Sequence, residues 1–64
     1  MTTFLTRLNE EKLQLEEKTN KLEAFLFTEP FNNLDTIQQG LLQIQLSAMQ
    51  TYLKCLNERL THLK

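Results

Sequence analysis

One row of polar side chains could bind a small molecule. It repeats every seven residues, along one edge of an expected helix, and consists of Gln38, Gln45, Tyr52 and Arg59. Tyr52 could stack on a nucleobase, Arg59 could hold a phosphate in bidentate fashion, and Gln45 could read a base edge. Symmetry-related copies of Arg59 would make a cleft between subunits locally positive. The alternative is that these long side chains only cover the rim of an apolar interface.

Two further residues belong to this hypothesis. Phe31 and Asn32 lie in the expected turn between two helices and could close the same cleft. The alternative is a packing role for the Phe31 ring and an N-cap role for Asn32 at the start of the second helix. The predicted ligand contacts are therefore Gln45, Tyr52, Arg59, Phe31 and Asn32.

The sequence contains no pattern that indicates catalysis or metal binding. Its one cysteine, Cys55, and one histidine, His62, are seven residues apart, which is about 10 Å along a helix and too far for a thiolate–imidazolium pair. We expect Cys55 to be a small core residue and His62 to be a solvated residue at a helix end. We therefore predict no enzyme, no catalytic residue, no metal site, no cofactor and no intrachain disulfide.

The overall charge argues against nucleic acid as a partner. Seven basic and eight acidic residues give a net charge of −1, whereas a nucleic-acid binder needs a basic surface to neutralise phosphates. No apolar run approaches the roughly 18 residues that span a bilayer, and no signal-peptide pattern opens the chain. We expect a soluble protein of the cytoplasm with no membrane partner.

Two long helices must position these side chains. The strongest helix-breaking cluster is 28–33, where Pro30 disfavours helical geometry at the residue before it. We predict one all-α domain over 1–64, with a helix at about 3–27, a turn at 28–32 and a helix at about 33–63. The short connection predicts an antiparallel two-helix hairpin.

Apolar spacing then predicts a homo-oligomeric helical bundle. The first helix carries one seam, whereas the second carries a heptad seam from Leu42 to Leu63 and another apolar stripe from Leu34 to Cys55. One neighbouring helix covers one seam, so the other requires helices from another copy or from another protein, and a four-helix dimer is the minimum oligomer. The expected oligomer interface consists of Leu42, Leu46, Met49, Leu53, Leu56, Leu60, Ile37, Leu41, Ile44 and Ala48. Gly40, near the start of this helix, indicates either local tolerance or close approach of another helix.

The second helix also carries a recognisable pattern. The run Leu41-Leu42-x-x-Gln45-x-x-Ala48-Met49-x-x-Tyr52-x-x-x-Leu56-x-x-Arg59, preceded by Lys21-Leu22-x-x-Phe25, resembles small helical-hairpin proteins of tailed phages, including crAss-like phages. The resemblance covers roughly residues 7–60. It implies a phage protein that acts in the cytoplasm of a bacterial host. Its size and architecture are also similar to those of phage sponge proteins, which sequester the nucleotide signals of Thoeris or CBASS immunity.

These observations predict an anti-defence protein that sequesters a cyclic or ADP-ribose-derived nucleotide between its own subunits without turnover. The main alternative is a homo-oligomeric module that occludes a host or phage protein, which the off-seam residues Phe4, Leu13 and Phe25 favour. A further alternative is a structural coiled-coil component.

Overall fold

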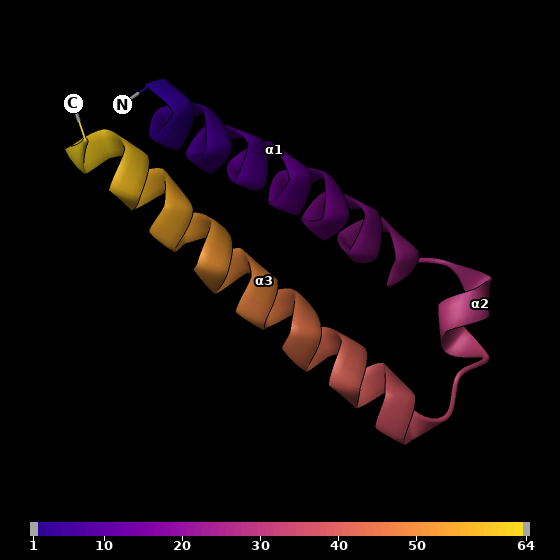
Figure 1. Ribbon diagram of the computed structural model, residues 1–64. Coiled ribbons are helices and arrows are strands. Elements are labelled where there is room, and N and C mark those ends of the chain that lie inside the picture. The colour runs from indigo at the N-terminus through magenta and orange to yellow at the C-terminus, as the bar shows by residue number, and fades with distance from the viewer. Residues whose placement is uncertain (1, 64) are drawn as a thin grey trace.

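The protein is all-α, as predicted. A computed structural model describes residues 2–63, which form α1 (Thr2–Phe25), the single-turn α2 (Glu29–Asn32) and α3 (Thr36–His62). The two long helices run side by side in opposite directions and α2 lies at the end where they are connected (Figure 1). The molecule is a rod with extents of 46 × 14 × 13 Å.

The first helix ends two residues earlier than predicted, and the predicted turn contains a helix of its own. Beyond Phe25, the amides of Phe27 and Thr28 bond to the carbonyls three residues before them, which tightens and ends α1. Thr28 is extended and its hydroxyl accepts from the Phe31 amide, and Pro30 lies in the first turn of α2, where a missing N–H is tolerated. Local capping therefore makes α2 where the sequence indicated only an irregular turn.

The prediction that Asn32 caps the second long helix is wrong. Asn32 is the last residue of α2, and α3 begins at Thr36 instead of 33. The N-cap is Asp35, whose Oδ1 accepts from the Gln38 amide at 2.8 Å. An acidic cap suits the positive end of the helix dipole, so the aspartate takes this position.

The connection between α2 and α3 is held by one side chain, Gln39, which was not among the predicted functional or capping residues. Gln39 Nε2 is within hydrogen-bond distance of three backbone oxygens, at 3.1 Å from Phe31, 3.3 Å from Asn32 and 3.1 Å from Leu34. Phe31 is buried and packs edge to face on Phe25, with ring centroids 6.0 Å apart. The turn is thus built from an aromatic contact and a side-chain amide that replaces missing backbone partners.

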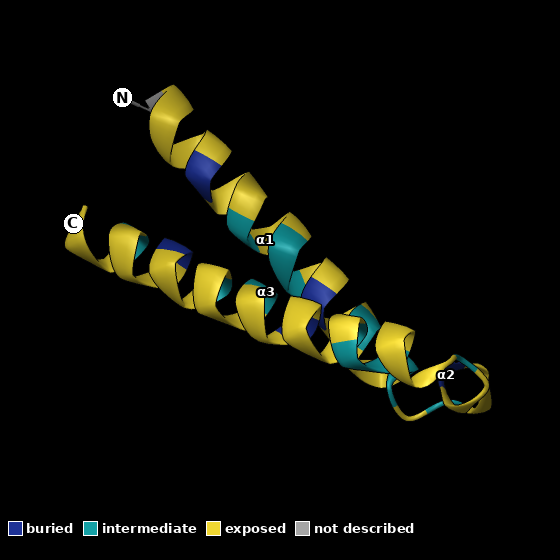
Figure 2. Ribbon diagram, turned by 90° about the horizontal axis from the view of Figure 1, so that it is seen from below, coloured by how far each residue is buried: buried dark blue, intermediate teal, exposed yellow. Residues whose placement is uncertain are grey.

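A narrow core runs between α1 and α3 (Figure 2). Its fully buried residue is Leu56 of α3, accompanied by Leu46 of α3 and Leu8 of α1. Thr19, which interrupts the apolar seam of α1, is also buried, and its hydroxyl donates to the Leu15 carbonyl at 2.6 Å. Because this bond satisfies the hydroxyl within its own helix, a polar residue is accommodated in the core.

Within residues 2–63, neither long helix is apolar enough over a sufficient length to cross a membrane.

Candidate functional site

One apolar face of α3 contacts no other helix among residues 2–63. From Leu42 to Leu60, the residues of the predicted heptad seam are buried or half-buried against α1, whereas Leu63 at its end is exposed. Leu34, the first residue of the other stripe, is half-buried, and the remaining residues of that stripe are exposed. We call the exposed set the outer stripe; it consists of Ile37, Leu41, Ile44, Ala48, Tyr52 and Cys55. Ile44, near its middle, is 66% exposed. Of the predicted oligomer interface, six residues therefore pack within the chain and four lie on this open face.

The outer stripe lies on a segment without charge. From Thr36 to Leu53 there is no Asp, Glu, Lys or Arg, whereas α1 contains nine such residues in a similar length. A helix that faces only water is usually rich in charged residues, and depletion of charge is typical of the centre of a protein interface. The composition of α3 is therefore that of an interface and not that of a helix that faces only water.

The predicted ligand contacts on α3 lie along one edge of this face, and Tyr52 belongs to both the edge and the face. Gln38, Gln45, Tyr52 and Arg59, here called the polar edge, are all exposed. At about 100° per residue, they fall between the seam that contacts α1 and the centre of the outer stripe, which are about 120° apart. Within residues 2–63, Arg59 makes no ion pair, and the hydrogen bonding of Gln45 Nε2 is limited to a long contact of 4.0 Å with the Met49 sulfur. Their polar groups therefore face solvent.

One chain does not bring the whole predicted site together. Tyr52 and Arg59 are about 10 Å apart along α3, a spacing that one nucleotide could bridge, but Asn32 lies at the far end, roughly 40 Å from Arg59. Asn32 is exposed, whereas Phe31 is only 6% exposed and packs on Phe25. The Phe31 ring thus has the packing role that was the alternative, and little of it is accessible to a ligand.

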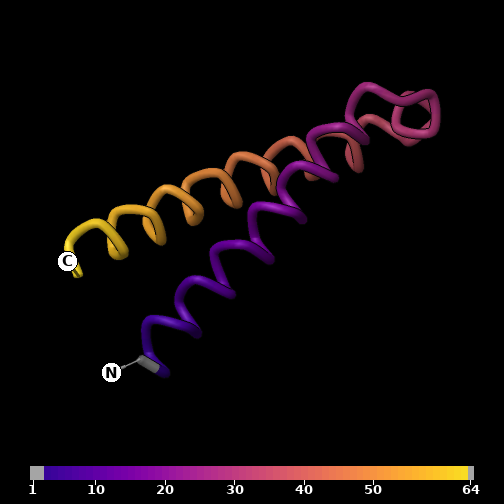
Figure 3. The backbone as a smooth tube through the Cα atoms, turned by 90° about the horizontal axis from the view of Figure 1, so that it is seen from above, coloured from indigo at the N-terminus to yellow at the C-terminus, as the bar shows by residue number. Residues whose placement is uncertain are grey.

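A second feature, which sequence reasoning missed, lies at the opposite end of the rod. Figure 3 shows the long helices diverging from the turn toward the termini. Between their ends is an open cleft of about 520 Å³, lined by Leu5, Asn9, Lys12, Asn57, Leu60, Thr61 and Leu63. None of the predicted ligand contacts lines it. Residue spacing along each helix could not predict this cleft, because the cleft depends on how α1 and α3 cross.

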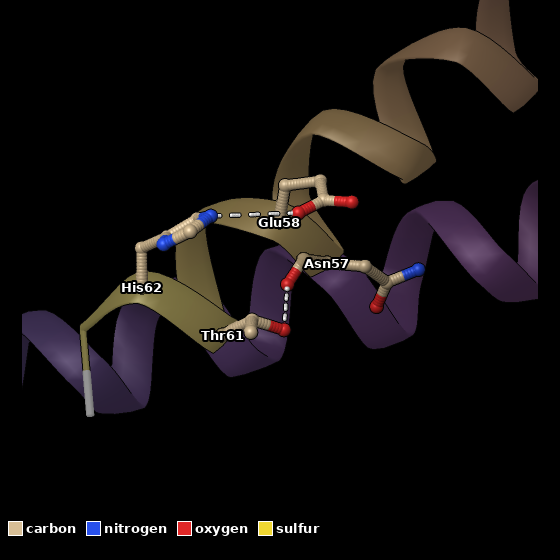
Figure 4. A network of polar contacts seen from close by, with 4 residues as sticks. All are labelled: Asn57, Glu58, Thr61 and His62. Atoms are coloured by element: carbon tan, nitrogen blue, oxygen red, sulfur yellow. Dashed lines mark hydrogen bonds and ion pairs between the residues drawn. The ribbon is translucent and has the colours of Figure 1, made fainter.

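The polar groups beside this cleft are already engaged locally. Thr61 Oγ1 donates to the Asn57 carbonyl at 3.0 Å, and Asn9 Nδ2 donates to the Leu5 carbonyl at 3.1 Å. On the adjoining turn, His62 Nε2 lies 3.7 Å from a Glu58 oxygen (Figure 4). These bonds organise the helix end and leave few convergent donors, so the cleft is a weaker candidate than the polar edge.

The structure also tests the predictions for the residues of possible chemical reactivity. Cys55 is exposed on the outer stripe, so the prediction that it is a core residue is wrong for the single chain. The reason is that α1 covers only one of the two apolar faces of α3. His62 is solvated at the end of α3, as predicted. No cluster of three potential metal-ligating side chains exists among residues 2–63.

Comparisons with known proteins identify relatives of this chain. The chain is 34% identical, over the full length of both proteins, to an uncharacterised 7.5 kDa protein from the denB–rIIB intergenic region of Enterobacteria phage T4. This similarity confirms the resemblance to small phage proteins. No solved structure matches the chain. The family model named Sequestin matches residues 2–62, nearly the whole chain. The protein therefore belongs to the Sequestin family.

Proposed function

We propose that this helical hairpin is an anti-defence protein that binds a nucleotide immune signal in a cleft between copies of itself and withholds it without turnover. The observation that carries the proposal is the polar edge beside the uncharged outer stripe. The family name, Sequestin, and a relative from a bacteriophage support sequestration inside an infected bacterium. Binding alone removes a signal when the protein is abundant, so no catalytic group is needed.

The polar edge has the chemistry that a nucleotide requires. The Arg59 guanidinium presents donors that match a phosphate, and the Tyr52 ring offers a surface on which a base can stack. Gln45, one helical repeat further along, has both a donor and an acceptor for a base edge or a ribose hydroxyl. Their spacing of about 10 Å suits different parts of one ligand such as an ADP-ribose derivative.

Calorimetry with a panel of cyclic and ADP-ribose-derived nucleotides tests this function. Loss of a charge-assisted contact costs about 1.5–3 kcal/mol, so Arg59→Ala should weaken binding by about 10–100-fold. Tyr52→Ala should cause a similar loss, whereas Tyr52→Phe should retain most of the affinity because the stacking ring remains.

Lys54→Ala is the matched control, because Lys54 is an exposed cation on the same half of α3 but lies away from the polar edge. It should bind as the wild-type chain does. Equal affinities for the wild-type, Arg59→Ala and Tyr52→Ala chains would refute the site assignment, and no binding of any nucleotide would refute the function.

Occlusion of a protein is the second candidate, because large apolar side chains are also exposed outside α3. Phe4, Leu13 and Phe27 are all exposed on α1 or the connection that follows it. This alternative predicts that nucleotides do not bind and that a single host protein is recovered by pull-down. Recovery of that protein should then be lost in a Phe27→Ser chain, whereas Arg59→Ala should not affect it.

A further inference from the structure

The arrangement of the outer stripe indicates how two copies pair. Its residues are nearly symmetric about the point midway between Ile44 and Ala48. Reversing the helix about this point exchanges Ile37 with Cys55 and Ile44 with Ala48, and brings Leu41 within one residue of Tyr52. A face with this symmetry is complementary to itself when two helices run antiparallel, as a two-fold interface requires. The small Ala48 then lies opposite the larger Ile44, which suits close packing.

We infer that two copies pair antiparallel through the outer stripes of α3, and that each nucleotide site is completed by residues of both copies. This inference rests on the proposed function for the ligand, and on the stripe for the pairing. A second copy is the favoured occupant because the stripe is uncharged as well as self-complementary. The core of one chain is also small, with Leu8, Phe31, Leu46 and Leu56 as its buried apolar residues, so a permanent partner would add the stability it lacks.

Charges at the ends of the stripe favour the antiparallel over the parallel direction. Parallel pairing would place Arg59 of one copy beside Arg59 of the other, which is unfavourable for like charges. In the antiparallel arrangement, the two Arg59 residues lie at opposite ends, roughly 40 Å apart. There are then two separate equivalent sites instead of one site with clustered arginines.

The antiparallel register also decides which residues share a site. Because the polar edge lies between the α1 seam and the outer stripe, the edges of both copies line the same side of the interface. Tyr52 of one copy then lies opposite Gln38 of the other, within one helical turn. Arg59 of one copy extends past the outer stripe of the other copy, to the turn that contains the other copy's Asn32. Each end of this groove thus combines an aromatic ring and a cation from one copy with side-chain amides from the other.

Oxidative cross-linking of the full chain tests the pairing. Facing positions in a helix pair can approach the roughly 4.4–6.8 Å between Cα atoms that a disulfide needs. Ile37→Cys should therefore give a covalent dimer, with the new thiol bonded to Cys55 of the other copy. The wild-type chain should not cross-link, because its two Cys55 residues are about 27 Å apart along the helices in this register. Ile37→Cys combined with Cys55→Ser is the control and should remain uncross-linked.

Cross-linking of the wild-type chain would indicate parallel pairing and overturn the inference, as would failure of the Ile37→Cys chain to cross-link. Leu13→Cys provides a further control, since Leu13 is as exposed as the outer stripe but lies on α1. Its dimer yield should be no greater than that of the wild-type chain.

Mixing two binding-defective variants tests whether the site is shared. Arg59→Ala removes the contact to the phosphate. Gln38→Glu places a negative charge beside the phosphate, and a glutamate is compatible with the first turn of α3. Each variant alone should lose nucleotide binding. When they are refolded together in equal amounts, half of the dimers contain both chains, and one of the two sites in each such dimer is intact. About a quarter of the wild-type binding capacity should return.

The two measurements separate the pairing from the function. A cross-linked dimer that binds no nucleotide would remove the proposed function and leave the pairing intact. If the wild-type chain binds nucleotide but mixing the two variants restores no binding, the ligand is held within one chain. That result would overturn the shared site.

Discussion

At the scale of single residues, side chains at the turn and at the helix starts determine the geometry of the chain. Asp35 begins α3 through its bond to the Gln38 amide, and Thr28 begins α2 through the Phe31 amide. Gln39 joins the two by bonding to backbone oxygens of the connection. Since the turn is proposed to contact a ligand held by another copy, these residues position the site without belonging to it.

Asp35→Ala should lower the free energy of unfolding by about 1 kcal/mol, because an amide at the start of α3 loses its partner. Asp35→Asn should keep most of the stability, since the asparagine oxygen can accept the same bond. Urea denaturation followed by circular dichroism measures both. Equal losses for the two variants would mean that the carboxylate contributes through charge and not through capping.

Gln39→Ala should destabilise the chain by about 1–2 kcal/mol, because it removes the donor to the Leu34 carbonyl in a part-buried turn. Gln43→Ala is the matched control, as Gln43 is an exposed glutamine on the same helix. Thermal denaturation of both variants is sufficient for the test. A Gln39→Ala chain as stable as the control would show that water replaces the amide at no cost.

At the scale of the elements, the apolar spacing of α3 predicted two seams for one neighbouring helix, but did not show which seam packs on α1. The seam from Leu42 to Leu60, predicted as part of the oligomer interface, is the face that contacts α1, and the outer stripe is exposed. The ends of the helices were predicted less well. Asn32 and Asp35 are both good caps, and the choice between them depends on α2, which is too short to show a periodic pattern.

The candidate site was also predictable only in part, because spacing along one helix does not reveal contacts between helices. Seven-residue spacing places Tyr52 and Arg59 on one edge of a helix whatever the tertiary structure. Whether Phe31 faces a ligand or the core depends on Phe25, a residue of another helix, and spacing along the chain does not reveal that contact. The cleft between the diverging helix ends depends on a crossing angle, which is likewise set by packing.

Leu56→Ala should cost about 2–5 kcal/mol, because Leu56 is 0% exposed between α1 and α3 and its removal leaves a cavity. Leu13→Ala, at a position that is 59% exposed, should change the stability by less than about 0.5 kcal/mol. Urea denaturation of both variants tests the packing. Similar stabilities would contradict the assignment of the core to this helix pair.

Gly40→Ala should raise the stability by about 1 kcal/mol, since Gly40 lies within α3 and an added Cβ would meet no atom within 4 Å. Its position is on the side of the outer stripe away from the polar edge, so pairing should be unaffected. Thermal denaturation and sedimentation measure the two effects. Weaker association of the variant would indicate that another helix approaches closely at this glycine.

At the scale of the whole molecule, a thin rod with a small core carries a large uncharged apolar face. Covering this face with a second copy explains three features together, namely the lack of charge, the near symmetry of the stripe and the polar edge beside it. Ile44→Glu should therefore give a monomer in analytical ultracentrifugation, because the charge would be buried near the two-fold axis. Leu13→Glu should leave the assembly unchanged, and dissociation by both variants would argue against this interface.

The central claim is that a defined assembly of this chain holds nucleotides between its copies without altering them. Native mass spectrometry, with the protein alone and after exposure to cyclic and ADP-ribose-derived nucleotides, tests it most directly. The account predicts a dimer that gains two nucleotides of unchanged mass. A monomer, a dimer that ignores the whole panel, or a bound nucleotide of altered mass would contradict it.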